Sequence, residues 1–297
     1  MAFNKKTKFK SESKSRTPSD LTITARHVDF DYQAAMTEKQ YWHGNDPVVT
    51  HFFNALQATF PEGERFFIDS ARDARDEFGE QNLSPELLGQ IKQFIRQEAL
   101  HGKQHDAWNQ ALINLGYTKM ADFDQELRQL RLWSRSKVSA NARLSMTAAS
   151  EHFTASIAHM FLNKRPDLLE NAAQPFQTLL IYHALEEVEH KAVCYDLYNE
   201  VSGHYGLRML GLLTSTLDIM YRVAERQIYL LKKDGLWNFK TAVQSWRLIW
   251  GKKGIAIQLF PYVMNYLRPS FHPWESDERP RLKQKYGDLL EQAGLSV

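Results

Sequence analysis

The stretch FQTLLIYHALEEVEHKAVCYDLY, residues 176–198, carries two histidines and a glutamate where the apolar face of a helix should continue. Read at 3.6 residues per turn, one face of this helix consists of Phe176, Leu180, His183, Glu187, His190, Cys194 and Leu197. A buried carboxylate takes up a proton, finds a charged partner or binds a metal ion. Because an imidazole lies about one turn away on either side of Glu187, the pattern favours a metal.

Three further helices with polar residues on apolar faces are predicted elsewhere in the sequence. They cover residues 46–79, with a restart at Pro61, residues 84–116 and residues 139–164. The first two open with a capping Asp or Ser followed directly by proline, which is typical of a helix start. The polar residues that interrupt the three apolar faces are Glu64, Glu98 with His101, and Glu151.

In chain order the four helices supply Glu, Glu-x-x-His, Glu and Glu-x-x-His, which is the ligand pattern of ferritin-like di-iron and di-manganese bundles. Residues three apart lie on the same face, so a Glu and a His of one helix can reach metals at the bundle centre. We therefore predict an all-α protein: a ferritin-like four-helix bundle with a dinuclear metal centre, plus additional C-terminal helices. The alternative, solvated glutamates and satisfied core histidines, conflicts with the cost of burying unpaired charge.

Four runs of the sequence resemble the bacterial family known as predicted metal-dependent hydrolases. They are DPVVTHFFNALQATFPEGERFF, FIRQEALHGKQHDAWN, SEHFTA and HALEEVEHKAVCYDLY. The resemblance extends from about residue 25 to 290 and implies a ferritin-like fold. Resemblance to di-iron carboxylate enzymes in general implies these roles: Glu98 and Glu187 bridge the metals, Glu64 and His101 complete one ion, and Glu151 and His190 complete the other.

The run His183-x-x-x-Glu187-x-x-His190 also resembles the extra-histidine helix of di-iron arylamine N-oxygenases. This resemblance implies that His183 is a seventh ligand. The alternative is a histidine that lies outside the ligand shell or in the core, because the spacing determines which helix face His183 occupies but not whether its ring reaches the metal. His105 lies one turn beyond the histidine of the second helix and could be a ligand or an outer hydrogen-bond partner. Glu186 is excluded from the predicted site because it points about 100° away from the ligand face.

Three kinds of function suit such a centre. The four-carboxylate set and the resemblance at His183 favour a di-iron oxidoreductase that activates dioxygen, oxidises a small or apolar organic substrate and takes electrons from a partner. The alternative is a metal-dependent hydrolase that uses metal-activated water. A non-catalytic metal-binding protein is the third. The expected cofactors are two divalent metal ions, iron first, with manganese or zinc as alternatives.

The composition is that of an ordinary soluble globular protein of 297 residues, 43% hydrophobic and 24% charged. Its net charge of +2 gives no reason to expect a nucleic acid as a partner. The single cysteine, Cys194, cannot form an internal disulfide, which fits a reducing compartment. The sequence shows neither a secretory signal nor an apolar run long enough to span a membrane. We therefore predict a cytoplasmic protein.

Three regions are expected along the chain: a disordered basic tail over residues 1–22, the metal-binding bundle over 23–203, and C-terminal helices over 204–297 that pack on the bundle. The third region combines aromatic residues such as Trp246 with basic residues such as Arg247. These residues could cover the entrance for an apolar, acyl-type substrate, pack a homodimer, or lie on the inner surface of a membrane.

Overall fold

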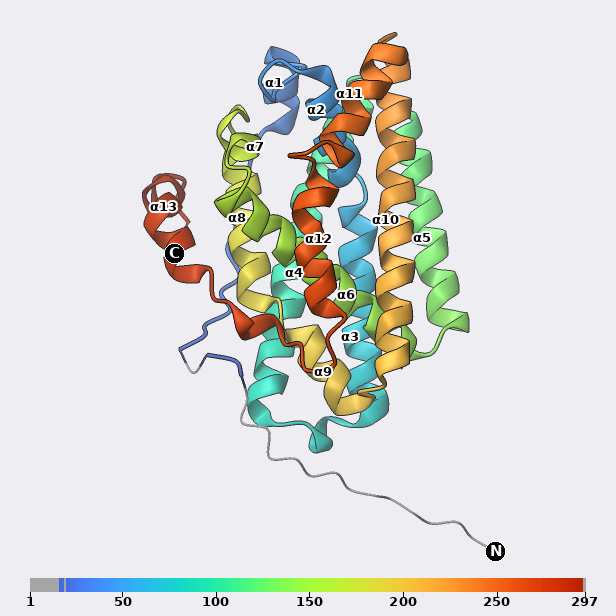
Figure 1. The fold of residues 1–297 in the computed structure, drawn as a ribbon, viewed down its shortest axis with the longest axis vertical. Helices are drawn as coiled ribbons and strands as arrows, with labels where there is room; N and C mark the ends of the chain where they lie inside the picture. The colour runs from blue at the N-terminus through green and yellow to red at the C-terminus, as the bar shows by residue number, and fades with distance from the viewer. Residues whose placement is uncertain (1–15, 19, 296–297) are drawn as a thin grey trace, which may run out of the picture.

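Four helical segments pack side by side around a common core in the computed structural model, which describes residues 16–18 and 20–295 (Figure 1). The segments are α3 (Phe60–Phe78), α4 (Pro85–Asn114), α6 (Ala140–Asn163), and α8 (Phe176–His190) with its continuation α9 (Val193–Val201). α3 contacts α4 and α6, and the α8–α9 segment contacts the same two helices, so the four segments form a closed ring. Within the described residues there is no β-strand, which confirms the all-α prediction. The ferritin-like class stays a prediction.

The capping residues begin the helices where the sequence predicts. The Asp46 carboxylate accepts hydrogen bonds from the first turn of α2 (Pro47–Gln57), and the Ser84 hydroxyl accepts one at the start of α4. α2 ends before Pro61, and α3 starts with this proline in its first turn, where the missing N–H has no helical partner to lose. The predicted restart at Pro61 is therefore confirmed.

One helix boundary differs from the prediction. The stretch 176–198 is predicted as one helix, but regular helix stops after His190 and resumes at Val193. Lys191 and Ala192 form a turn there, and the Lys191 ammonium reaches Glu278 and the carbonyl of Ser276. The helix α5 (Lys119–Lys137) connects α4 to α6.

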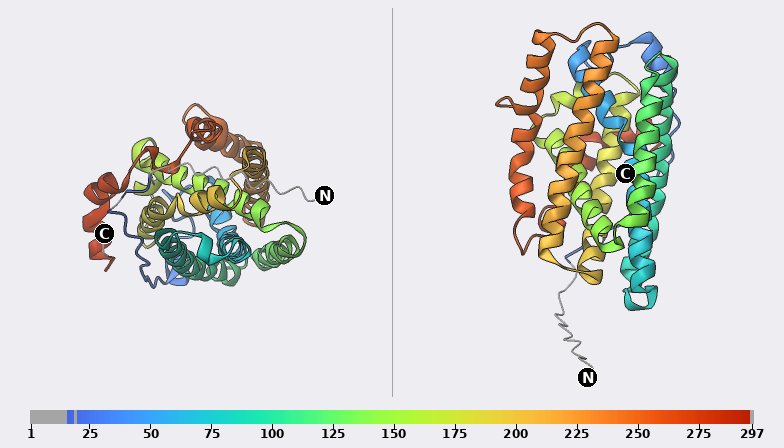
Figure 2. Two further views of the ribbon diagram at one scale, coloured as in Figure 1. Left: turned by 90° about the horizontal axis from the view of Figure 1, so that it is seen from below. Right: turned by 90° about the vertical axis from the view of Figure 1, so that its right-hand side faces the viewer.

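An outer layer of helices covers the bundle (Figure 2). α10 (Tyr205–Lys233) packs against α2 and α6, and α11 (Phe239–Trp250) and α12 (Ile255–Tyr266) run beside it in the opposite direction. At the crossing with α6, a Cβ on Gly211 would come within 2.5 Å of the Ser145 carbonyl oxygen, so only glycine allows this approach. The remaining helices are α1 (Tyr32–Glu38) on α4, α5 on α3 and α4, α7 (Asp167–Glu170), α13 (Arg279–Gln292) on α8, and the short η1 (Glu80–Asn82) and η2 (Pro273–Glu275).

Asp234 ties the end of α10 to the bundle. Its carboxylate accepts hydrogen bonds from the hydroxyls of Tyr41 and Tyr117 and lies 2.8 Å from Nε2 of His51. Burial acts to raise the pKa of Asp234, but these hydrogen bonds outweigh it and hold the pKa below its usual value. The ionised carboxylate therefore fastens the outer layer to α2 and to the segment that precedes it.

The predicted disordered tail falls largely on residues 1–15 and 19, which lie outside the described residues. The boundary at 203/204 coincides with the turn between α9 and α10, but the division into regions stays a prediction. Across residues 16–18 and 20–295, no helix combines the length and apolar character that crossing a membrane requires.

Candidate metal centre

Eight buried side chains converge inside the bundle, and they include every residue that the sequence predicts for the site. They are Glu64 on α3, Glu98, His101 and His105 on α4, Glu151 on α6, and His183, Glu187 and His190 on α8. None is more than 7% exposed to solvent. The i, i+3 and i, i+4 spacings put the residues of one helix on one face, and packing turns these faces toward each other.

One group consists of Glu98, His101, Glu187 and His190. One donor atom from each residue can be chosen so that all lie within 4.8 Å of one another. His190 Nε2 is 3.2 Å from a Glu98 oxygen, and His101 Nδ1 is 3.9 Å from Oε1 of Glu187. Two carboxylates and two imidazoles from α4 and α8 thus surround one point.

A second group consists of Glu64, His105 and His183, again within 4.8 Å of one another. His105 Nε2 lies 3.1 Å and His183 Nε2 lies 4.0 Å from Oε1 of Glu64. Glu187 connects the two groups, because its Oε1 is 2.7 Å from His183 Nε2. The grouping differs from the one that the resemblance implies, since His105, and not His101, lies beside Glu64.

Glu151 lies beside the first group. One of its oxygens is hydrogen-bonded to Nδ1 of His190 at 2.8 Å, which leaves Nε2 of this histidine facing Glu98. A carboxylate that holds the far nitrogen of a metal-binding histidine is the usual outer partner in such sites. In this structure Glu151 has the position of that partner, with its other oxygen buried and without a hydrogen bond to the described residues.

Glu186 and Arg26 also belong to the site, although the sequence pattern excludes the first and does not indicate the second. The Glu186 side chain is fully buried, and its Oε2 lies 2.8 Å from Nε2 of His101. Arg26 contacts the other oxygen of Glu186 through both its backbone N–H and its guanidinium, and it also pairs with Glu189. A helical wheel cannot reveal this connection, because Arg26 lies in an irregular segment before the bundle.

Buried polar atoms without hydrogen bonds mark the centre as a candidate cation site. Both oxygens of Glu64 and of Glu98 and both ring nitrogens of His105 are buried, and none has hydrogen-bond geometry to any part of the chain that the structure describes. Such atoms cost folding free energy unless something else binds them. A divalent ion satisfies this donor set, because mixed carboxylate and imidazole ligands suit iron, manganese and zinc.

The electrostatics of the centre agree with this fit. Burial raises the pKa of Glu64 and Glu98 well above the usual value, and repulsion from neighbouring carboxylates adds to the effect. Burial, followed by the charge of His183, lowers the pKa of His101 and His105. These two imidazoles are therefore neutral, which is the form that binds metals, and cations could replace the protons on the carboxyl groups.

The family of the chain follows from a comparison with family models. Residues 24–277 match the model described as "Predicted metal-dependent hydrolase". The chain belongs to this family. Neither a curated protein nor a solved structure matches the sequence of this chain. Family membership and the two buried groups together indicate divalent metal ions as the cofactor, as expected from the sequence.

A narrow apolar cavity of about 40 Å³ adjoins the centre. His183 and Glu187 form part of its wall, so it is the one of the two cavities described that reaches the candidate ligands. Its other lining residues come from α2, the start of α3, α6 and α8, and they are mainly apolar: Phe53, Leu56, Gln57, Phe60, Thr154, Ile157, Ala158, Phe161, Leu180 and Ala184.

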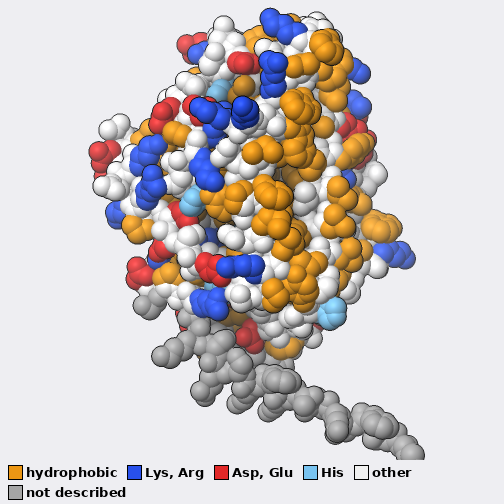
Figure 3. Space-filling view, viewed as in Figure 1, with side chains coloured by type: hydrophobic (Ala, Val, Ile, Leu, Met, Phe, Trp, Pro, Cys, Tyr) orange, Lys and Arg blue, Asp and Glu red, His pale blue; other side chains and the backbone are white. Residues whose placement is uncertain are grey.

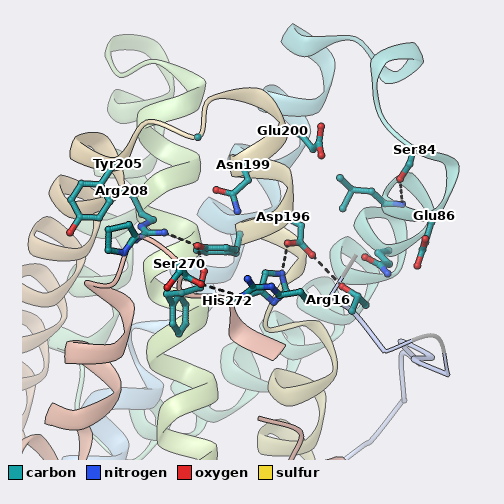
Figure 4. A pocket seen from close by; sticks show the side chains of 17 residues that line it. Arg16, Ser84, Glu86, Asp196, Asn199, Glu200, Tyr205, Arg208, Ser270 and His272 are labelled. Carbon is teal, nitrogen blue, oxygen red and sulfur yellow. Dashed lines mark hydrogen bonds and ion pairs between the residues drawn. The ribbon is translucent and has the colours of Figure 1, made fainter. Parts of the chain in front are cut away.

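A much larger cavity, of about 740 Å³, lies elsewhere, and none of the eight candidate ligands lines it (Figure 4). Several of its polar groups are paired with one another. Asp196 lies 2.9 Å from Nε2 of His272, and Arg208 donates to the hydroxyl of Tyr195. Size alone would favour this cavity, but the unpaired donor atoms identify the buried centre as the candidate site.

Proposed function

We propose that this chain is a dinuclear metal-dependent hydrolase that acts on an apolar ester or amide. The observation that carries the proposal is the pair of adjoining Glu/His groups, which open on one side to an apolar cavity. Glu98, His101, Glu187 and His190 would hold one ion. Glu64, His105 and His183 would hold the other, with Glu187 between the two.

A divalent ion in this centre would lower the pKa of a coordinated water toward neutrality and polarise a substrate carbonyl. The protein supplies orientation. The carboxylate of Glu151 holds Nδ1 of His190, and Glu186 lies against Nε2 of His101, so the nitrogen of each ring that faces the first group is determined. Phe60, whose ring lies 4.9 Å from that of His105 and 5.3 Å from that of His183, shields the second group from water.

The lining of the cavity supports an apolar substrate with one polar group. Aromatic and aliphatic side chains make up most of the wall. Gln57 is the polar exception: it is 1% exposed, and its side-chain oxygen has no hydrogen bond to the described residues. This oxygen is available to accept a hydrogen bond from an N–H or O–H group of a substrate whose apolar part fills the cavity, because a buried acceptor without a partner is costly.

A panel of nitrophenyl esters of increasing acyl length tests the proposal with zinc- or manganese-loaded protein. We expect metal-dependent hydrolysis that favours the shorter acyl chains, because the cavity is small, and that falls to background in Glu98→Ala. The control is Glu77→Ala, which removes an exposed glutamate of α3 and should keep full activity. Hydrolysis that survives in Glu98→Ala, or that does not depend on metal, would contradict the proposal.

A second candidate function is dioxygen activation by two ferrous ions, and the donor set favours it. The two groups supply three buried carboxylates and four imidazoles, and Glu151 lies beside them; this mixed set suits iron. Adding dioxygen to protein loaded anaerobically with ferrous iron separates the two candidates. New visible absorption from the iron, without esterase activity, would favour oxidation over hydrolysis.

A further inference from the structure

The outer side of α10, α11 and α12 exposes large apolar residues along the length of the molecule (Figure 3). We call this surface the outer apolar face and define it by six residues that are each 46–60% exposed: Leu210, Leu213 and Leu217 on α10, Trp246 on α11, and Ile257 and Phe260 on α12. Scattered exposed apolar residues are normal, but a continuous band of them marks a surface that contacts something else.

The band follows from the sequence periodicity of α10. Leu210, Leu213 and Leu217 recur at spacings of three and four and point outward, while Leu212 and Ser215 are buried on the side that packs toward α6. A helix on the surface of a bundle normally turns charged residues outward on this side. This half of α10 is therefore apolar on both sides.

The charge of the region indicates what covers the face. Between residues 205 and 268 there are ten Lys and Arg against three Asp and Glu; Arg208 and Arg226 are buried, so eight basic residues remain to face outward in a chain whose net charge is only +2. Exposed cations of this region include Lys232, Lys240, Arg247, Lys252 and Lys253. A second copy would bring two positively charged surfaces together, so the charge favours an anionic partner.

We propose that the outer apolar face docks on an anionic lipid surface and lies in the interface without crossing it. Helices that bind in this way combine an apolar side rich in Trp, Phe and Leu with Lys and Arg that reach the headgroups. Aromatic residues such as Trp246, Trp250 and Tyr221, each more than 40% exposed, suit the boundary between lipid and water. The described helices that form the face are not membrane-spanning candidates, which agrees with peripheral binding.

Co-sedimentation of the full chain with lipid vesicles tests this proposal. We expect the protein to pellet with vesicles of phosphatidylglycerol and phosphatidylcholine, to pellet far less with phosphatidylcholine alone, and to be released from the anionic vesicles by high salt. A protein that stays in the supernatant with anionic vesicles at low salt would overturn the proposal.

Matched double variants locate the binding surface. Leu217→Glu with Trp246→Glu should weaken binding to the anionic vesicles by on the order of tenfold or more. The control, Leu132→Glu with Trp133→Glu, makes the same changes at residues of α5 that are 50% and 56% exposed, and it should bind like the wild type. Equal loss in both double variants would contradict a specific face.

A charge variant keeps the test decisive if the first double variant folds poorly, which circular dichroism would reveal. Lys252→Glu with Lys253→Glu changes two exposed residues in the turn between α11 and α12 and should weaken binding to anionic vesicles and reduce its salt dependence. Light scattering tests whether a second copy of the chain covers the outer apolar face instead. A stable dimer that Leu217→Glu with Trp246→Glu dissociates would assign the face to a second copy and overturn the lipid proposal.

Discussion

The orientation of His101 depends on two residues that bind no metal in our account. Glu186 lies 2.8 Å from Nε2 of this histidine, and Arg26 holds Glu186 through its backbone and side chain. Burial raises the pKa of Glu186 to about 7, although Arg26 acts to lower it. The charge on this carboxyl group therefore depends on Arg26, which connects the segment before the bundle to the metal centre.

Replacing Glu186 by Gln should lower metal affinity by about 10- to 100-fold, the usual effect of losing an outer carboxylate. Competition with a chelator of known affinity measures this change. Glu189→Gln is the matched control, because Glu189 is buried and also pairs with Arg26, but its other partners are Thr24 and Gln97 and not His101. If both variants lose affinity equally, Arg26 acts through general stability and not through His101.

Helical spacing predicts which residues face the centre but not how side chains meet across helices. Glu64 and His183 come from helices far apart in sequence, yet each is identified because it interrupts an apolar face. The pairing of His105 with Glu64 depends on the stagger between α3 and α4, which no single-helix pattern contains. Arg26 could not be predicted at all, since its segment has no periodicity.

At the scale of helices, the contact between α10 and α6 brings two backbones close together. The crossing requires glycine at position 211, because any Cβ there would overlap the backbone of Ser145. The hydroxyl of Ser215, one turn later, donates to the Met146 carbonyl across the same contact. This crossing, together with Asp234, holds the outer layer in place.

Gly211→Ala should lower the free energy of unfolding by roughly 1–3 kcal/mol, the range for overpacking a tight contact. Urea denaturation measures the change. Gly89→Ala is the matched control: Gly89 is exposed in α4 with nothing within 4 Å of its added Cβ, so alanine there should stabilise the protein by about 0.5–1 kcal/mol. A neutral Gly211→Ala would contradict the close packing of α10 on α6.

Helix starts could be predicted better than helix ends. Asp46 and Ser84 form their predicted caps because these signals are local and act through one side chain. The stop after His190 has no such signal. There, Lys191 reaches residues about 85 positions later in the chain, and a contact of this kind arises only in the folded protein.

At the scale of the whole molecule, metal-free protein should become less stable as the pH rises from about 7 to about 8.5. Burial raises the pKa of Glu64 and Glu98 well above the usual value, so their contribution to stability also falls as the pH rises above the usual carboxyl range. Protonated His190 also loses its contribution to stability as the pH rises. Burial acts to lower its pKa, but Glu151 and Glu187 outweigh burial and raise the pKa to about 9. Each such proton contributes up to about 1.4 kcal/mol per pH unit.

Thermal unfolding at the two pH values, with chelator-treated and metal-loaded protein, measures this effect. Bound cations would replace the protons on the carboxyl groups, so the loaded protein should not lose stability over the same range. The account of the centre would be contradicted if the metal-free protein gained stability with pH, or if loading made no difference to the slope.

The whole fold could be predicted only in outline. The all-α class follows from the lack of strand periodicity, and the four helices of the bundle follow from their caps and apolar faces. The ring arrangement of α3, α4, α6 and α8–α9 was expected from the ligand pattern alone. The exposed band on α10–α12 could not be distinguished from core packing, because its leucines and aromatics recur at the spacing of a buried helix.

The metal content of the purified protein shows whether the eight buried Glu and His side chains form a centre for two divalent ions. Elemental analysis should find two ions per wild-type chain and a loss of both in Glu187→Gln, since Glu187 lies between the two groups. Glu77→Gln changes an exposed residue of α3, and this variant should keep both metal ions. A wild-type chain that binds no divalent metal after loading, or a Glu187→Gln variant that keeps two ions, would contradict the account.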